Sequence, residues 1–175
     1  SNKPVIFISG HFNNFELMAM EIEKSGVNLA AIYRPLNNMF LDKIMVYLRK
    51  KFICKNQLVK GISGVRDSFK LFKKGFSLAL MIDQRLSEGI KISFFGKNAS
   101  TTTLPAQFVK KFKAKIVPIY IYRSENFKFK MKVNEPLRFE ENETTEDITL
   151  KLNIWIENQI IKNPEQWIWS HDRWK

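Results

Sequence analysis

The alternation of short apolar runs with longer segments of helical period constrains this chain more than any other feature. Residues 5–9 and 29–33 are brief runs of apolar and β-branched side chains, closed by Gly10 and by Arg34-Pro35. Such runs predict buried strands, and residues 76–83 and 116–122 repeat the pattern. Strands separated by helices predict an α/β sandwich, with a mixed, mostly parallel sheet flanked by helices.

The intervening segments carry apolar residues at helical spacing. The first predicted helix begins at Asn14 and ends at Ser25-Gly26, and others cover approximately 41–52, 65–72 and 103–113. Thr144 and Asp147 form a capping box that starts the last helix. Residues 127–133 alternate strictly between Lys and apolar side chains, which predicts a strand that is antiparallel or at the sheet edge.

The length of 175 residues suits one domain with a substantial core, and a hydrophobic fraction of 45% excludes a disordered chain. Its longest apolar runs, such as residues 78–82, are too short to cross a bilayer. The sequence begins at Ser1 without a Met and soon enters a strand. We therefore expect residues 1–175 to be a single domain and a fragment of a longer protein.

The net charge of +12 predicts an anionic partner, which the charge alone leaves open among nucleic acid, phospholipid and an acidic protein. Most aromatics fall at core-face positions rather than among the basic residues, which argues against specific nucleic-acid binding. Cys54 is the only cysteine, so no internal disulfide forms, and we expect it to be buried. Neither His11 nor His171 has neighbours at metal-ligand spacing, so no metal or cofactor is predicted.

Ligands of a parallel α/β sheet bind beyond the carboxyl ends of the strands, which directs attention to residues 10–16, Arg34 and Asp83. If His11 lies in a strand-to-helix turn and Glu16 in the first helical turn, the carboxylate can accept the imidazole N–H. The other imidazole nitrogen is then available to take a proton. By spacing alone, the commoner reading is a hydrogen-bonded turn histidine beside a solvated glutamate.

Arg34 and Asp83, the polar residues that follow the other two strands, have two interpretations each. Arg34 is suited to a phosphate or an oxyanion, or is a surface arginine at a strand end. Asp83 is suited to orienting Arg34 or binding a sugar hydroxyl, or caps a turn. The free N–H groups at the start of the first helix, where Asn13 and Asn14 are good capping residues, also favour negative charge.

An ordered set of short motifs along nearly the whole chain resembles the late acyltransferases of lipid A biosynthesis, the lauroyl and myristoyl transferase family. Their wider relatives are the glycerolipid acyltransferases, which carry a His-x4-Asp/Glu motif. In chain order, the motifs are Ile8-Ser9-Gly10-His11 with Glu16, Tyr33-Arg34-Pro35-Leu36-Asn37-Asn38, Leu48-Arg49, Gly64-Val65-Arg66, Ile82-Asp83-Gln84, Phe94-Phe95-Gly96 with Ala99 and Thr101, Ile116-Val117-Pro118-Ile119, and Pro164-Glu165-Gln166-Trp167-Ile168-Trp169 with Arg173-Trp174-Lys175.

The resemblance implies a glycerolipid-acyltransferase-like sandwich that moves an acyl chain from acyl carrier protein to a hydroxyl of a phosphorylated glucosamine disaccharide. It implies that His11 is the general base and that Glu16 orients it, with Arg34 at a phosphate or oxyanion and Asp83 in support. Arg66, Gln84 and Asn14 complete the expected substrate contacts.

The resemblance also implies work on an anionic lipid at the cytoplasmic face of the inner membrane, with an upstream membrane helix in the full-length protein. Two alternatives stay open. The acceptor is a lysophospholipid or another glycolipid, or the domain is non-catalytic and uses its basic faces to bind a membrane or a carrier protein.

The chain departs from the family pattern in three places. Asn13-Asn14-Phe15 stands where the family commonly has Gly-Asn-Trp, and Asn13 is expected to supply the left-handed conformation of the glycine. The segment at residues 85–88 is more charged than usual. His171 lies in a slightly irregular ending, and we expect a structural role for it.

Overall fold

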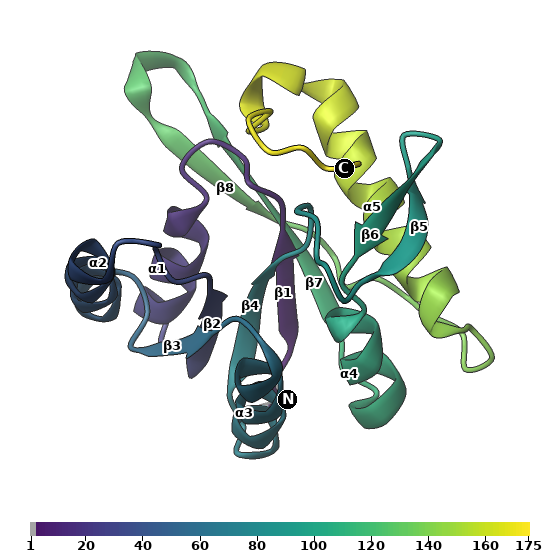
Figure 1. Ribbon diagram of the computed structural model, residues 1–175, viewed down its shortest axis with the longest axis horizontal. Helices are drawn as coiled ribbons and strands as arrows, with labels where there is room; N and C mark the ends of the chain where they lie inside the picture. Colours follow the sequence, from purple (N-terminus) through teal and green to yellow (C-terminus); the bar gives the residue numbers. More distant parts are fainter. Residues whose placement is uncertain (1–2) are drawn as a thin grey trace. The chain divides into compact units, whose positions relative to one another are not determined.

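The computed structural model describes residues 3–175 (Figure 1). It alternates strands and helices as the sequence predicts. In chain order the elements are β1 (Ile6–Ser9), α1 (Glu16–Lys24), β2 (Leu29–Tyr33), α2 (Met39–Phe52), β3 (Asn56–Val59), α3 (Ile62–Lys73), β4 (Ser77–Met81), β5 (Ile90–Phe94), β6 (Lys97–Thr101), α4 (Leu104–Phe112), β7 (Ile116–Arg123), the 3-10 turn η1 (Glu125–Phe127), β8 (Phe129–Val133), α5 (Thr145–Lys162) and the 3-10 turn η2 (Pro164–Gln166).

The main sheet has six strands in the order β3-β2-β4-β1-β7-β8, and β5 and β6 form a separate two-stranded ladder. Strand β2 runs parallel to both β3 and β4, whereas β8 is antiparallel to β7 and lies at the edge of the sheet. Strand β1 follows β4 in register, since the amide of Leu78 donates to Val5 and the amide of Ile82 donates to Ser9. The predicted fold class and the edge position of the Lys-alternating strand are therefore confirmed.

Two compact units make up the chain. Unit 1 consists of the residues up to Phe7 together with Glu16–Leu80, and unit 2 consists of Ile8–Phe15 together with Met81–Lys175. Strands β1 and β4 contribute residues to both units.

In unit 1, helices α1, α2 and α3 contact strands β2 and β3. The fit of α3 depends on Gly64, because a Cβ at that position would lie 1.9 Å from the carbonyl oxygen of Val59. Asn38 caps the start of helix α2, since its side chain accepts from the amides of Phe40 and Leu41. No residue of α2 is buried, although the helix is rich in apolar side chains.

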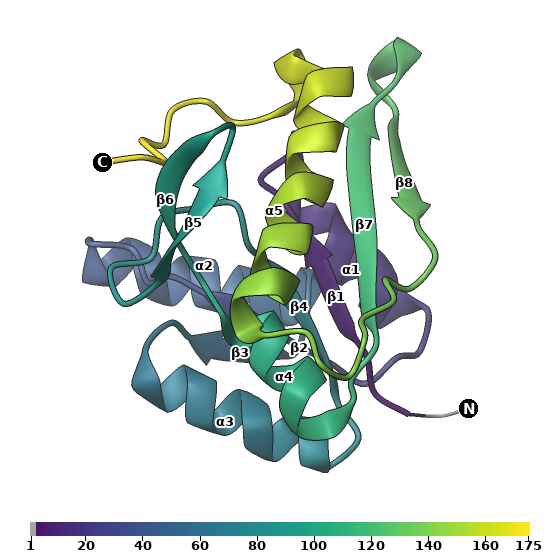
Figure 2. The same ribbon diagram turned by 90° about the vertical axis from the view of Figure 1, so that its right-hand side faces the viewer.

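In unit 2, strand β7 and helix α5 both supply fully buried core residues, among them Ile116, Ile119, Ile148 and Ile156. Helix α5 starts at the predicted capping box and runs beside the β5–β6 hairpin (Figure 2). The guanidinium of Arg173 is also buried and donates to the carbonyl oxygen of Ser100 at 2.8 Å. The end of the described chain is thereby fixed to β6.

The structure adds elements that the pattern did not predict. Strand β3 has the short sequence Asn-Gln-Leu-Val and only partial burial, so it lacks the apolar run of the other strands. The β5–β6 hairpin turns at Phe95 and Gly96, both with positive φ, and was also missed. Strand β8 begins at Phe129 instead of residue 127 because the backbone at Asn126 and Phe127 is left-handed.

None of the helices in residues 3–175 combines the length and hydropathy needed to span a bilayer.

Cys54 is 1% exposed, and burial raises the pKa of its thiol to about 12. The expectation that this cysteine is buried is confirmed.

Candidate active site

The central feature of the site is a contact between His11 and Asp83, both in unit 2. The imidazole Nδ1 of His11 lies 2.7 Å from Oδ1 of Asp83, and the side chains are 16% and 1% exposed. The backbone amide of His11 also donates to Oδ2 of Asp83 at 2.8 Å. Asp83 therefore fixes both the backbone and the ring of the histidine.

Trp167 provides a third donor to the same carboxylate. Its indole Nε1 lies 2.7 Å from Oδ2 of Asp83 in a buried contact. Asp83 is thus held by three N–H groups, which compensate for the loss of water around a buried charge.

The order of the strands brings His11 and Asp83 together. Asp83 follows β4 by two residues and His11 follows β1 by two residues, and the two parallel strands are neighbours. Gly10 allows the close approach, since a Cβ there would lie 3.3 Å from Cγ of Asp83 and 2.8 Å from the ring of Phe12. The carboxyl ends of adjacent strands thus place the His11 ring against Asp83, at the edge where ligands of this class of sheet bind.

Residues 166–168 hold the loop that carries His11, at residues 11–13. The carbonyl of Gln166 accepts from the amide of Asn13 at 2.8 Å, and the amide of Ile168 donates to the carbonyl of His11 at 3.0 Å. The side-chain amide of Asn13 also donates to Oε1 of Gln166. Asn13 has φ of 43°, so the left-handed conformation expected of it is confirmed.

The electrostatics of the pair favour an ionised Asp83. Burial alone would raise the pKa of Asp83, but the hydrogen bonds and charge of His11 and the Trp167 indole outweigh burial and hold the pKa below its usual value. An ionised carboxylate has only acceptors, so Nδ1 of His11 carries the hydrogen. In the neutral form of the ring, the acceptor nitrogen is then Nε2, which is the atom that a general base would use.

The chain matches the family model of the bacterial lipid A biosynthesis acyltransferases over residues 1–175. It belongs to that family. A search of curated proteins found no match. Family membership makes the chain an acyltransferase of lipid A biosynthesis, whose acceptor is a lipid and whose reaction requires an acyl donor.

Glu16, the carboxylate of the family's His-x4-Asp/Glu spacing, has a different described partner from the one predicted. In unit 1, its Oε1 accepts from Nε of Arg49 at 3.0 Å and from Nη2 of Arg49 at 2.6 Å. The N–H of the His11 ring is hydrogen-bonded to Asp83. Within unit 2, the carboxylate that contacts the His11 ring is thus Asp83, and the role of Glu16 in orienting His11 stays a prediction.

The remaining predicted substrate-contact residues lie in both units. Arg34 is exposed just after β2, and Arg66 on α3 is exposed with its Nε 4.0 Å from Asp67. Asn14 is exposed in the segment between His11 and the start of α1, and Gln84 is half-buried next to Asp83 in the sequence. Their roles in binding substrate stay predictions.

Two contributors to the site lacked a local sequence signal. Trp167 and Gln166 belong to the Pro164–Trp169 motif. However, Trp167 lies 84 positions after its partner Asp83, and Gln166 lies 153 positions after its partner Asn13.

His171 has a structural contact, since its Nε2 accepts from the amide of Arg85 at 3.0 Å. Within residues 3–175, no cluster of His, Cys, Asp and Glu is arranged to hold a metal ion.

Proposed function

We propose that the protein transfers a fatty acyl chain from acyl carrier protein to a hydroxyl of a lipid A precursor, with His11 as the general base. The observation that carries the proposal is the 2.7 Å contact between Nδ1 of His11 and the buried Asp83. Family membership supplies the reaction class, and the contact supplies a residue able to perform its proton transfers.

The reaction follows from the chemistry of the imidazole. Nε2 of His11 takes the proton of the acceptor hydroxyl while the oxygen attacks the thioester carbonyl, which forms a tetrahedral oxyanion. The ionised Asp83 stabilises the imidazolium that results. The oxyanion then collapses, the C–S bond breaks, and the imidazolium returns its proton to the thiolate. The products are an ester and the free thiol of the carrier.

The proposed partners agree with the charge of the chain. Acyl carrier protein is acidic, lipid A precursors carry phosphates, and the cytoplasmic leaflet of the inner membrane is negative, so a net charge of +12 favours all three. Arg34 and Arg66 are the proposed contacts for phosphates of the acceptor, because a guanidinium matches the geometry of phosphate oxygens.

Incubation of the purified protein with acyl carrier protein thioester and the phosphorylated disaccharide precursor tests the proposal. We expect an acylated product, detected by mass spectrometry, and loss of about 99% or more of the turnover in His11→Ala. The matched control is His171→Ala, which removes the only other histidine. Full activity in His11→Ala would overturn the role of His11.

The acceptor is tested separately by offering lysophosphatidic acid under the same conditions. The proposal expects acylation of the disaccharide precursor. Acylation of lysophosphatidic acid but not of the disaccharide would overturn the acceptor while leaving the role of His11 intact.

A further inference from the structure

Helix α2 presents apolar side chains to solvent. Phe40 is 83% exposed, Ile44 is 54% exposed and Phe52 is 57% exposed. Surface helices of globular proteins normally turn this face toward the core, and contiguous exposed apolar surface marks an interaction site. The exposed apolar face of α2 therefore indicates that this helix has a binding partner.

The exposed residues form one stripe along the helix. Phe40, Ile44, Leu48 and Phe52 recur at intervals of four, and Tyr47 lies beside them at 60% exposure. We call these five residues the α2 stripe. The opposite side of α2 is joined to the rest of unit 1 by polar contacts. Asp42 accepts from the amide of Leu36 at 2.8 Å, and Arg49 forms an ion pair with Glu16. The orientation of the helix is thus fixed with the stripe outward.

Further apolar residues lie at one edge of unit 1. Strands β2 and β3 run parallel with Tyr33 opposite Val59, so the segments that follow them leave from the same edge of the sheet. Leu36, after β2, is 41% exposed, and Ile62, after β3, is 92% exposed. Exposed apolar side chains are therefore present at the carboxyl edge of unit 1 as well as on α2.

Lysines accompany the stripe. Lys43, Lys50 and Lys51 are exposed residues of α2. The ammonium of Lys51 lies 5.2 Å from the ring centre of Phe52 and 5.6 Å from that of Tyr47, so its charge sits on the apolar face itself. An apolar face accompanied by lysines is typical of helices that lie in the headgroup region of a membrane.

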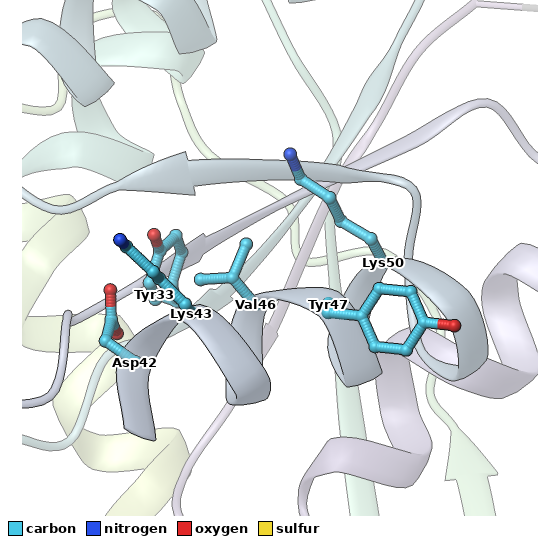
Figure 3. Close-up of a pocket in the computed structure, with 6 residues that line it drawn as sticks. All are labelled: Tyr33, Asp42, Lys43, Val46, Tyr47 and Lys50. Atoms are coloured by element: carbon cyan, nitrogen blue, oxygen red, sulfur yellow. The ribbon is translucent and has the colours of Figure 1, made fainter. Parts of the chain in front are cut away.

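A depression of about 460 Å³ lies beside the stripe. It is lined by Tyr33, Asp42, Lys43, Val46, Tyr47 and Lys50. Figure 3 shows Lys43 next to Tyr33 and Asp42 at one end and Lys50 farther along the helix. Two ammonium groups and one carboxylate, which already accepts from Leu36, make the depression suitable for an anionic headgroup.

We propose that the α2 stripe docks on an anionic lipid bilayer, with Lys43, Lys50 and Lys51 at the level of the headgroups. The inference rests on the proposed function in one respect, since an enzyme whose acceptor is a lipid must reach that lipid in its membrane. Charge complementarity selects this occupant. A second copy docked stripe to stripe would bring the same lysines together, and like charges oppose that contact.

Vesicle co-sedimentation tests the proposal. The stripe variant carries Phe40→Ser, Ile44→Ser and Phe52→Ser, and the control carries Val133→Ser, Ile154→Ser and Ile161→Ser. The control residues lie in unit 2 and are exposed by 55%, 44% and 64%, similar to the stripe. Vesicles of phosphatidylglycerol with phosphatidylethanolamine should bind the stripe variant at least about tenfold more weakly than the wild type. The control should change less than about twofold.

The lysines are tested by Lys43→Gln, Lys50→Gln and Lys51→Gln. Binding to the anionic vesicles should fall about fivefold per lysine, while binding to neutral phosphatidylcholine vesicles stays unchanged. Unchanged binding of the stripe variant to anionic vesicles would overturn the proposal. So would a wild-type dimer in size-exclusion chromatography that the stripe substitutions dissociate without weakening vesicle binding.

The same variants separate this inference from the proposed function. The stripe variant should acylate a detergent-dispersed acceptor at the wild-type rate and a vesicle-embedded acceptor more slowly. His11→Ala should bind vesicles as the wild type does. If no acylation occurs but the stripe variant loses vesicle binding, the proposed function fails and the docking surface stands.

Discussion

Asp83 in unit 2 and Glu16 in unit 1 are held in different ways. The side chain of Asp83 is 1% exposed and accepts from two N–H groups of His11 and from the indole of Trp167. That of Glu16 is 28% exposed, and its described hydrogen bonds come from the guanidinium of Arg49 alone. The first arrangement fixes an imidazole, and the second joins α1 to α2. Nearness to a histidine in sequence therefore does not predict which carboxylate its ring contacts.

The largest expected effect is that of Asp83→Asn. An amide no longer stabilises the imidazolium and can favour the wrong tautomer of His11, so we expect kcat to fall about a thousandfold with little change in KM. Steady-state acylation kinetics measure the loss, with circular dichroism to verify folding. Glu16→Gln is the matched comparison, and a greater loss of kcat in Glu16→Gln than in Asp83→Asn would indicate that Glu16 is the carboxylate that assists His11.

A smaller effect is expected from Trp167→Phe. This change removes one of the three donors to Asp83 but keeps an aromatic ring next to Phe94, whose centre lies 6.1 Å away. We expect kcat to fall about tenfold, because a hydrogen bond to a charged group is worth about 1.5–3 kcal/mol. Trp169→Phe is the control, since that indole donates to the carbonyl of Pro164 instead. Equal losses in the two variants would contradict a specific role for Trp167.

Glu16→Gln should act on stability more than on catalysis. Loss of the charge facing Arg49 is expected to lower the free energy of unfolding by about 1–2 kcal/mol, measured by urea denaturation, with kcat reduced less than about tenfold. The surface pair of Glu21 and Lys24 offers a control. Because both of its side chains are well exposed, Glu21→Gln should cost less than about 0.5 kcal/mol.

The smallest effect expected concerns acid pH. The pKa of Asp83 is lower in the folded protein than its ordinary value of 3.8, because the donors from His11 and Trp167 outweigh the opposing effect of burial. Its ionised form therefore contributes stability above that value, and the contribution is lost as the pH falls through the folded pKa. Urea denaturation of wild type and Asp83→Asn should show a gap in unfolding free energy that is constant near neutral pH and narrows below about pH 4. A gap that widens in acid would contradict the depressed pKa.

The sequence predicted the strands whose apolar runs are buried and the edge strand whose lysines alternate. It did not predict β3, because Asn56 and Gln57 replace the apolar residues that mark a buried strand. The approximate position of the site was also predictable, since His11 and Asp83 both follow strands of a mostly parallel sheet. Their direct contact was not, because local patterns do not state that β4 is the neighbour of β1.

Orientation of helices was a second limit. The spacing of Ile44, Leu48 and Phe52 predicts an amphipathic helix, and α2 is one. Periodicity identifies which residues share a face, but it does not say what that face contacts. Partners far along the chain decide this, as Glu16 does for Arg49, which lies 33 positions later.

The buried state of Cys54 has a practical consequence for spectroscopy. A thiol that is 1% exposed, with its pKa raised by burial to about 12, reacts very slowly with maleimides near neutral pH, since the thiolate is the reactive form. A cysteine introduced at Ile44 would then be the only rapidly labelled position, without removal of the native residue. An environment-sensitive dye placed there would report directly on the polarity that α2 meets when it binds.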